Sequence, residues 1–217
     1  MTASPPAASV SAWISRCIVV LCLWMAAAAA WAAPRPLLVV GDSLSAAHNI
    51  PVESGWVSLL EDRLAESMVT PPKVINASIS GETSAGALTR LPALLEQHRP
   101  GVVVIELGGN DALRGLSPVQ LRDNLARMIE ASREAGAKVL LLGIEIPSNY
   151  GPAYRDRVRG VYSGLAESLD VAMLPFLLDG IALDPALMQA DGIHPTAAAQ
   201  PRVLDNVWPR LEPLLDE

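Results

Sequence analysis

The sequence predicts an α/β fold, in which one parallel sheet is covered by helices on both faces. Short apolar runs, typical of strands, alternate with stretches of helical periodicity from residue 36 to the end of the chain. The runs are apolar at nearly every position, which indicates strands buried on both faces, as in parallel sheets. Because no repeat, linker or low-complexity segment interrupts this alternation, residues 33–217 are expected to form a single domain.

Five apolar runs are expected to form the strands. Each is bounded by glycine, proline or polar residues, as buried strands in α/β proteins usually are. The run 102–107 is nearly all β-branched, so we expect it to lie at the centre of the sheet. The full set is 36–40, 73–77, 102–107, 138–144 and 171–174.

Helices are expected between these strands. The first has apolar residues at positions i, i+3, i+4 and i+8, counted from Trp56, which is the stripe of an amphipathic helix. Pro92 predicts a kink or a helix boundary near Leu91, and Pro209 and Pro213 predict interruptions of the last helix. The expected helices are 55–68, 85–98, one opened by Ser117-Pro118 and closed by Gly136, 153–169, and one capped by Thr196 that runs to about Leu215.

The first thirty-two residues have the pattern of a secretory signal peptide. Residues 1–16 carry no acid and one base, Arg16, and the apolar stretch 17–31 leads to the small-x-small site Ala30-Trp31-Ala32. The alternative is a permanent anchor helix, but the apolar stretch is shorter than the ~20 residues that span a bilayer. We therefore expect cleavage before Ala33, export to the periplasm or the cell exterior, and no stable membrane span afterwards.

Composition excludes some classes of function. Removal of residues 1–32 takes away Arg16 and no acid, which changes the formal net charge from −7 to −8. An acidic chain without basic runs is a poor candidate for nucleic-acid binding, which depends on phosphate neutralisation. Both cysteines, Cys17 and Cys22, lie in the removed segment, so the mature chain is expected to have no disulfide and no thiolate site.

A serine follows the first predicted strand. In a parallel sheet, the loops at the carboxyl ends of the strands converge on one rim, where ligands bind. Gly41 permits a tight turn there, and Ser43 follows it at the start of the loop. Asp42 or Ser43 also suits an ordinary helix N-cap. Ser43 is therefore a candidate nucleophile only if a base can reach it.

One of the three histidines is placed to act as that base. His98 closes a helix, where a base complements the helix dipole, and His48 is near Ser43 in sequence but too near to be an obvious base. His194 follows Asp191 by three residues, so one turn can hold the carboxylate against Nδ1 and leave Nε2 for a serine hydroxyl. The alternative is a surface turn that happens to contain Asp and His.

Two further loops supply candidate oxyanion donors. Gly81 lies in a strand-to-helix loop, where a glycine lets a backbone N–H approach a ligand closely. Asn110 follows Gly108-Gly109 at the end of the third strand, so its side-chain amide can point into the same crevice. Each can also be an ordinary turn residue.

Together these segments resemble a known family of hydrolases. In this order, Gly41-Asp42-Ser43-Leu44, Gly81, Gly109-Asn110-Asp111 and Asp191-Gly192-Ile193-His194 are similar to the four blocks of the SGNH (GDSL) hydrolases. The likeness extends from about Leu37 to Leu215 and is greatest to a bacterial esterase subgroup. It implies a flavodoxin-like, three-layer α/β/α sandwich with a five-stranded parallel sheet, monomeric and independent of metals and cofactors.

The resemblance also implies a role for each site residue. Ser43 would be the nucleophile, His194 the general base and then acid, and Asp191 the carboxylate that orients it. The oxyanion hole would consist of the Ser43 N–H, the Gly81 N–H and the Asn110 side chain. No G-x-S-x-G elbow surrounds Ser43, as expected for this family.

The implied activity is hydrolysis of acyl esters, thioesters or lysophospholipids through an acyl-enzyme. Apolar residues of the loops after the third and fourth strands are candidates for an acyl-chain groove: Leu113, Leu116, Ile146 and Pro147. Two positions depart from the subgroup. Ala47-His48 stands where the subgroup tends to have Gly-Tyr, and Glu145 stands where a base is expected.

Two other functions remain open at the level of sequence. A carbohydrate O-acetylesterase shares the four blocks, although the apolar rim and compact chain count against it. A non-catalytic flavodoxin-like module that binds a nucleotide is the second, but Gly41-Asp42-Ser43-Leu44-Ser45 lacks a phosphate-binding pattern. Three scattered histidines do not predict a metal site.

Overall fold

In the computed structural model, which describes residues 33–215, five parallel strands form one sheet. The strand order is β2-β1-β3-β4-β5, which is the flavodoxin-like order. The strands are β1 (Leu37–Gly41), β2 (Val74–Asn76), β3 (Val102–Glu106), β4 (Lys138–Leu142) and β5 (Ala172–Leu174). All five predicted strands are confirmed, and β3 lies at the centre, as expected. The predicted signal peptide, residues 1–32, lies outside the described residues.

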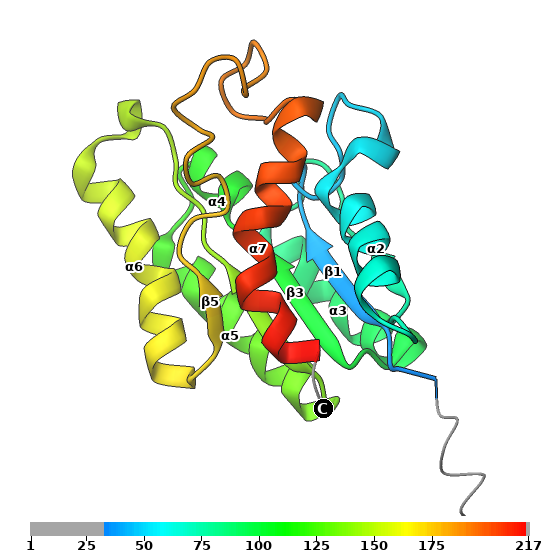
Figure 1. Cartoon of the computed structure of the whole chain (residues 1–217). Coiled ribbons are helices and arrows are strands. Elements are labelled where there is room, and N and C mark those ends of the chain that lie inside the picture. The colour runs from blue at the N-terminus through cyan, green and yellow to red at the C-terminus, as the bar shows by residue number, and fades with distance from the viewer. Residues whose placement is uncertain (1–32, 216–217) are drawn as a thin grey trace, which may run out of the picture. The chain divides into compact units, whose positions relative to one another are not determined.

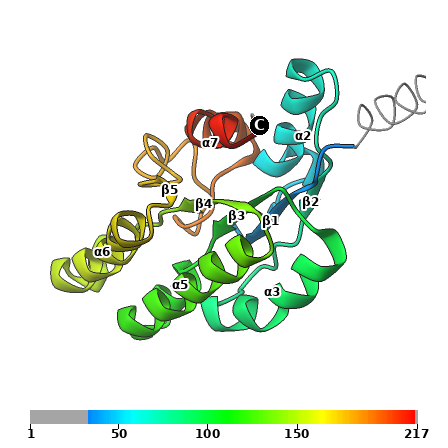
Figure 2. The same ribbon diagram turned by 90° about the horizontal axis from the view of Figure 1, so that it is seen from below.

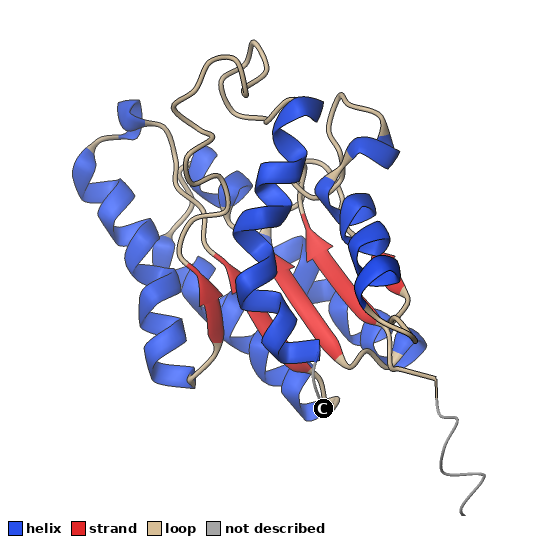
Figure 3. Ribbon diagram, viewed as in Figure 1, coloured by secondary structure: helices blue, strands red, loops and turns tan. Residues whose placement is uncertain are grey.

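Helices cover both faces of the sheet, so the predicted three-layer sandwich is confirmed (Figures 1 and 2). One face carries α2 (Trp56–Ser67) and α7 (Gln200–Leu215), which contact each other. The other face carries α3 (Ser84–His98), α5 (Pro118–Glu134) and α6 (Pro152–Leu169). Figure 3 shows the strands in red between the two helical layers.

The core forms on both sides because successive strand residues point to opposite faces. In β1, Leu38 and Val40 join the apolar cluster under α3 and α5, whereas Leu37 and Val39 join the cluster under α2 and α7. All four side chains are fully buried. This double burial explains why the strands are apolar at consecutive positions.

The prolines do not end the helices, so the expected boundary near Leu91 and the expected interruptions of the last helix were wrong. α3 continues through Pro92, and α7 continues through Pro209 and Pro213. A proline removes one N–H from the helical ladder, and its ring crowds the carbonyl four residues earlier, but apolar packing of the same helix against the sheet compensates for this cost. α7 also begins later than expected, since a 3-10 turn, η4 (Ala197–Ala199), follows Thr196.

Three short elements that the sequence did not predict lie in the loops after the strands. They are η2 (Val52–Ser54), α4 (Gly109–Leu113) and η3 (Ser148–Tyr150). All three follow the carboxyl end of a strand, so they form part of the rim where a ligand is expected. In the part of the chain that the structure describes, no helix combines the length and apolarity needed to cross a membrane.

Candidate active site

Ser43 lies on a tight turn directly after β1. The backbone carbonyl of Asp42 accepts the N–H of Ala46 at 3.0 Å, and the Asp42 side chain accepts the N–H of Leu44 at 3.1 Å. Gly41 has no space for a side chain, because a Cβ there would lie 2.8 Å from the Glu106 carboxyl and 2.9 Å from the Ser45 hydroxyl. The glycine of this block is therefore required by close packing under the turn.

Glu106, the last residue of β3, supports this turn from below. Its Oε2 accepts the Asp42 N–H at 3.2 Å and the Ser45 hydroxyl at 2.8 Å. The side chain is completely buried. Burial and the neighbouring Asp42 carboxylate raise the pKa of Glu106 well above its usual 4.5, so this group favours its protonated form. The sequence analysis did not identify Glu106.

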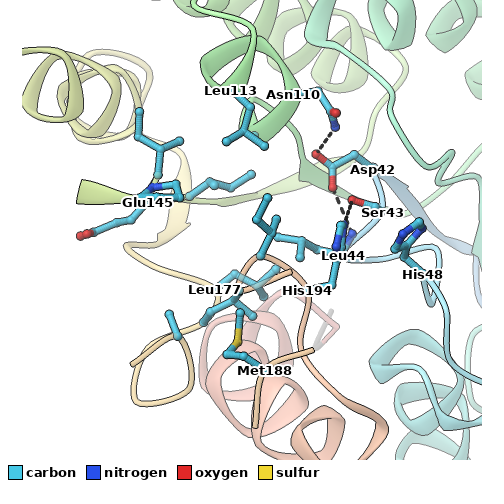
Figure 4. Close-up of a pocket in the computed structure, with 18 of the residues that line it drawn as sticks. Asp42, Ser43, Leu44, His48, Asn110, Leu113, Glu145, Leu177, Met188 and His194 are labelled. Atoms are coloured by element: carbon cyan, nitrogen blue, oxygen red, sulfur yellow. Dashed lines mark hydrogen bonds between the residues drawn. The ribbon is translucent and has the colours of Figure 1, made fainter. Parts of the chain in front are cut away.

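His194 connects Ser43 to Asp191 through two hydrogen bonds. Its Nδ1 donates to Asp191 Oδ2 at 2.7 Å. Its Nε2 lies 2.8 Å from the Ser43 hydroxyl, which donates to it (Figure 4). Ser43 follows β1 and His194 precedes η4, so the fold brings the two ends of the sequence together. Two of the residues that the sequence analysis singled out, Ser43 and Asp191, are therefore each hydrogen-bonded to the third, His194.

The Asp191 turn is built by local hydrogen bonds. Asp191 Oδ1 accepts the N–H groups of Ile193 at 2.9 Å and His194 at 3.0 Å. Gly192 has φ +65°, a left-handed conformation that glycine adopts without strain. Partial burial alone would raise the pKa of Asp191, but the hydrogen bonds from His194 and Ile193 outweigh it and lower the pKa to about 2. Asp191 is thus held as a carboxylate.

Gly81 and Asn110 open onto the same cavity as Ser43. Gly81 has φ +81°, and Arg114 donates to its carbonyl oxygen at 2.9 Å. Asn110 lies in the first turn of α4, where its Nδ2 donates to Asp42 Oδ2 at 2.9 Å. An amide nitrogen carries two hydrogens, so one N–H of Asn110 is left to donate to a ligand.

A second network joins the loops that carry Gly81 and Asn110. The buried carboxylate of Asp111 accepts the backbone N–H of Ser84 at 2.8 Å and its hydroxyl at 2.5 Å. Asn124 of α5 donates to the same hydroxyl at 2.9 Å. Since Ser84 begins α3 and Asp111 lies in α4, this network fixes the two loops relative to each other.

The cavity beside Ser43 has a volume of about 600 Å³ and is mostly apolar in its lining residues. Leu113, Ile146 and Pro147 line it, as the sequence analysis expected, whereas Leu116 lies outside the lining and is exposed. Sequence reasoning missed the contribution of the segment after β5. That segment and its neighbours add Phe176, Leu177, Leu178, Ala182, Leu183, Met188 and Ile193.

Two ionisable residues that depart from the subgroup also line the cavity. The His48 ring lies against the His194 ring, with centroids 4.2 Å apart and planes tilted by 36°. Glu145 pairs with Arg155 at 3.4 Å and with Arg159 at 3.1 Å. His98 lies in the last turn of α3, as expected, and is half-buried there. Within residues 33–215, no cluster of three or more His, Cys, Asp or Glu side chains is arranged to hold a metal.

Comparison with known sequences agrees with the geometry. The model of the GDSL-like lipase/acylhydrolase family matches residues 39–201. The chain is 55% identical to esterase TesA of Pseudomonas aeruginosa, over 89% of this chain and 96% of that protein. It is 45% identical to an arylesterase of Vibrio mimicus, over 86% and 93% of the two chains. It is 43% identical to thioesterase 1/protease 1/lysophospholipase L1 of Escherichia coli, over 85% and 87%.

Comparison with solved structures gives the same result. The crystal structure of TesA aligns with a TM-score of 0.80 at 56% identity, over 82% of this chain and 99% of that one. A psychrotrophic esterase, EstA from Pseudoalteromonas sp., in a structure inhibited by monoethylphosphonate, aligns with a TM-score of 0.79 at 41% identity. That alignment covers 84% of this chain and 100% of EstA.

Proposed function

The chain belongs to the GDSL-like lipase/acylhydrolase family, and from this premise we propose that Ser43, His194 and Asp191 are its catalytic triad. The protein is a hydrolase of carboxylic ester and thioester bonds, as are the relatives named esterase, arylesterase and thioesterase. A non-catalytic binding module is thereby excluded. The observation that supports the triad most directly is the 2.8 Å contact between the Ser43 hydroxyl and His194 Nε2.

In the first half-reaction, Ser43 Oγ attacks the acyl carbonyl carbon while His194 Nε2 takes the hydroxyl proton. The tetrahedral intermediate collapses, the bond to the leaving oxygen or sulfur breaks, and His194 gives its proton to the departing alcohol or thiol. Asp191 holds the Nδ1–H throughout, which stabilises the imidazolium that forms. The product is an acyl ester of Ser43.

Water completes the cycle. A water molecule attacks the acyl carbon as His194 takes one of its protons, and a second tetrahedral intermediate forms. This intermediate expels Ser43 Oγ, which recovers its proton from His194, and the carboxylic acid leaves. In both half-reactions the negative oxygen would accept hydrogen bonds from the Ser43 N–H, the Gly81 N–H and the Asn110 amide.

The cavity favours substrates with an extended acyl chain. The apolar part of its lining consists of Leu, Ile, Met, Phe, Pro and Ala side chains, which stabilise an aliphatic chain by removing it from water. A sugar acetate has little apolar surface to bury in such a groove, which argues against a carbohydrate O-acetylesterase. We therefore propose acyl esters, acyl thioesters and lysophospholipids as substrates, with Leu113, Ile146 and Pro147 in contact with the chain.

We also propose that the active form is a secreted or periplasmic monomer. The pattern of residues 1–32 supports export, with cleavage before Ala33. The remaining residues 33–217 would act as a single domain, without metal, organic cofactor or nucleic acid. Static light scattering of the exported protein checks the monomer, and N-terminal sequencing checks the cleavage site.

An active-site probe tests the triad. A fluorophosphonate forms a covalent bond with an activated serine, so we expect one label per wild-type molecule and none in Ser43→Ala. Ser148→Ala is the matched control, because Ser148 lines the same cavity but belongs to η3, which follows β4. Turnover of nitrophenyl esters, acyl thioesters, lysophospholipids and acetylated sugars then ranks the substrates. Labelling that survives in Ser43→Ala rules Ser43 out as the nucleophile.

A further inference from the structure

His48 contacts the proposed catalytic base directly. Its ring centroid lies 4.2 Å from that of His194, and the two planes are tilted by 36°. In Figure 4, the His48 ring lies beside Ser43 and His194 at one end of the cavity.

The loop around His48 is constructed to hold this ring in place. Ala47 and Asn49 on either side have φ values of +55° and +54°, left-handed conformations that are unfavourable for alanine. The Asn49 side-chain amide lies 3.1 Å from His48 Nε2 and donates to it. Because His48 Nε2 accepts this hydrogen bond, it is not the nitrogen that takes the proton from Ser43.

Gln189 connects this loop to the loop of the base. Its side-chain amide donates to the backbone carbonyl of His48 at 2.9 Å and to that of Pro195 at 3.0 Å. Its backbone N–H donates to the carbonyl of His194 at 2.8 Å. One side chain thus fixes the distance between the segment of His48 and the segment of His194.

The contact matters most after Ser43 has been acylated. At that stage Ser43 no longer has a hydroxyl, so Nε2 of His194 loses the 2.8 Å hydrogen bond that holds it in the free enzyme. Asp191 then holds the ring by Nδ1 alone, and the Asp191 side chain is 39% exposed. A ring held at one atom can still rotate about its side-chain bonds, unless a neighbour packs against its face.

We propose that His48 is a positioning residue for deacylation. By packing against the face of the imidazole, it keeps His194 Nε2 directed at the acyl carbon while water attacks. Gln189 supports the same contact, because it holds the backbone of His48 next to the loop that carries His194. The inference rests on the proposed role of His194, and it concerns the second half-reaction.

The test compares His48→Ala with His48→Phe, which keeps a flat ring and removes both nitrogens. Stopped-flow measurements with a nitrophenyl ester give acylation from the burst of nitrophenol and deacylation from the steady rate. We expect His48→Ala to slow deacylation by about 10- to 100-fold, because small displacements of catalytic groups have effects of this size. The acylation rate and kcat/KM should change little, KM should fall together with kcat, and the burst should appear or grow. His48→Phe should stay within about 3-fold of the wild type.

Controls separate this role from others. His98→Ala removes the remaining histidine, at the end of α3, and should leave both rates unchanged. Gln189→Met removes the amide that joins the loops, and it should also slow deacylation. The test therefore stays informative if His48→Ala does not fold. Thermal unfolding of each variant establishes that it is folded.

Three outcomes overturn the inference. The first is equal damage in His48→Phe and His48→Ala, which would mean that the ring face is not what matters. The second is a rise in KM with kcat unchanged, which would make His48 a substrate contact. The third is normal deacylation in both His48→Ala and Gln189→Met. Failure of the triad itself is distinguishable, because Ser43→Ala would then retain ester turnover.

Discussion

Glu106 accepts the backbone N–H of Asp42 at 3.2 Å, so two buried carboxyl groups lie next to each other beneath the turn that carries Ser43. Burial raises the pKa of both groups, and for Glu106 the Asp42 charge raises it further. Asn110 and the Leu44 N–H oppose this shift at Asp42. The pair is therefore most stable when Glu106 is protonated and Asp42 accepts the hydrogen bonds of Asn110 and the Leu44 N–H.

Glu106→Gln should preserve the fold and change its pH dependence. Above pH 4.5 the unfolded chain releases the Glu106 proton while the folded chain retains it, so the free energy of unfolding falls as pH rises through the raised pKa. Glutamine does not titrate, so the variant should gain stability relative to the wild type as pH rises above 4.5. Urea unfolding across this range measures the difference. A difference that is constant with pH contradicts a protonated Glu106.

Glu106→Ala tests the structural role of the same side chain. It leaves the buried Asp42 N–H and Ser45 hydroxyl without their acceptor and opens a cavity under the turn. We expect a loss of about 2 to 4 kcal/mol in the free energy of unfolding, together with a lower kcat. Urea unfolding and ester turnover of the same preparation check both effects.

Sequence patterns were sufficient to predict the strands, and they also pointed to the three residues that we propose as the triad. The strands are buried on both faces, so residues such as those of β1 are apolar at consecutive positions and can be recognised locally. Ser43, Asp191 and His194 could be predicted because their motifs occur in a family-specific order, each at the end of a predicted element. These residues lie close together because the parallel topology brings the loops at the carboxyl ends of the strands to one edge of the sheet.

Other parts of the site depend on contacts that no local pattern encodes. Glu106 is one polar residue in a β-branched strand, and only the packed turn above it reveals its role. The contact between His48 and His194 joins segments far apart in the chain, and the Gln189 amide that supports it resembles any loop residue. The helix through Pro92 likewise continues because of tertiary packing, which outweighs the loss of one hydrogen bond.

Asn110→Ala should lower kcat by about 10² to 10³, the usual effect of removing one oxyanion donor. The variant also removes the donor to Asp42 Oδ2, but Leu44 still donates to Oδ1, so the turn of Ser43 should persist. Steady-state turnover of a nitrophenyl ester gives kcat, and fluorophosphonate labelling of Ser43 reports whether the turn is intact. Turnover at the wild-type rate would remove Asn110 from the oxyanion hole.

Asp191→Asn should lower kcat by about 10² to 10⁴, since the amide favours the wrong tautomer of His194. The Asp191 carboxylate has a pKa of about 2, below its usual 3.8. Its contribution to the free energy of unfolding is therefore complete above pH 3.8 and is lost as pH falls through about 2. Activity lost on acidification between about pH 7 and pH 5 therefore reflects a group other than Asp191.

The control for this variant is Asp184→Asn. Asp184 is an exposed residue in the loop after β5, and its side chain accepts the N–H of Ala186. We expect its kcat to equal that of the wild type across the pH range. Equal losses in both variants would mean that the loop, and not the carboxylate at His194, determines the rate.

Leu113→Asp should change the acyl-chain preference, and Leu116→Asp should not. Leu113 lines the cavity, whereas Leu116, three residues further on, is 39% exposed and lies outside it. An aspartate at 113 places a charge where a chain would be buried, and each buried methylene is worth about 0.8 kcal/mol. We expect kcat/KM for the octanoyl and palmitoyl nitrophenyl esters to fall at least about tenfold relative to the acetyl ester. An unchanged chain-length profile in Leu113→Asp, or an equal change in Leu116→Asp, would mean that the chain lies elsewhere in the cavity, against the segment that carries Phe176 and Leu177.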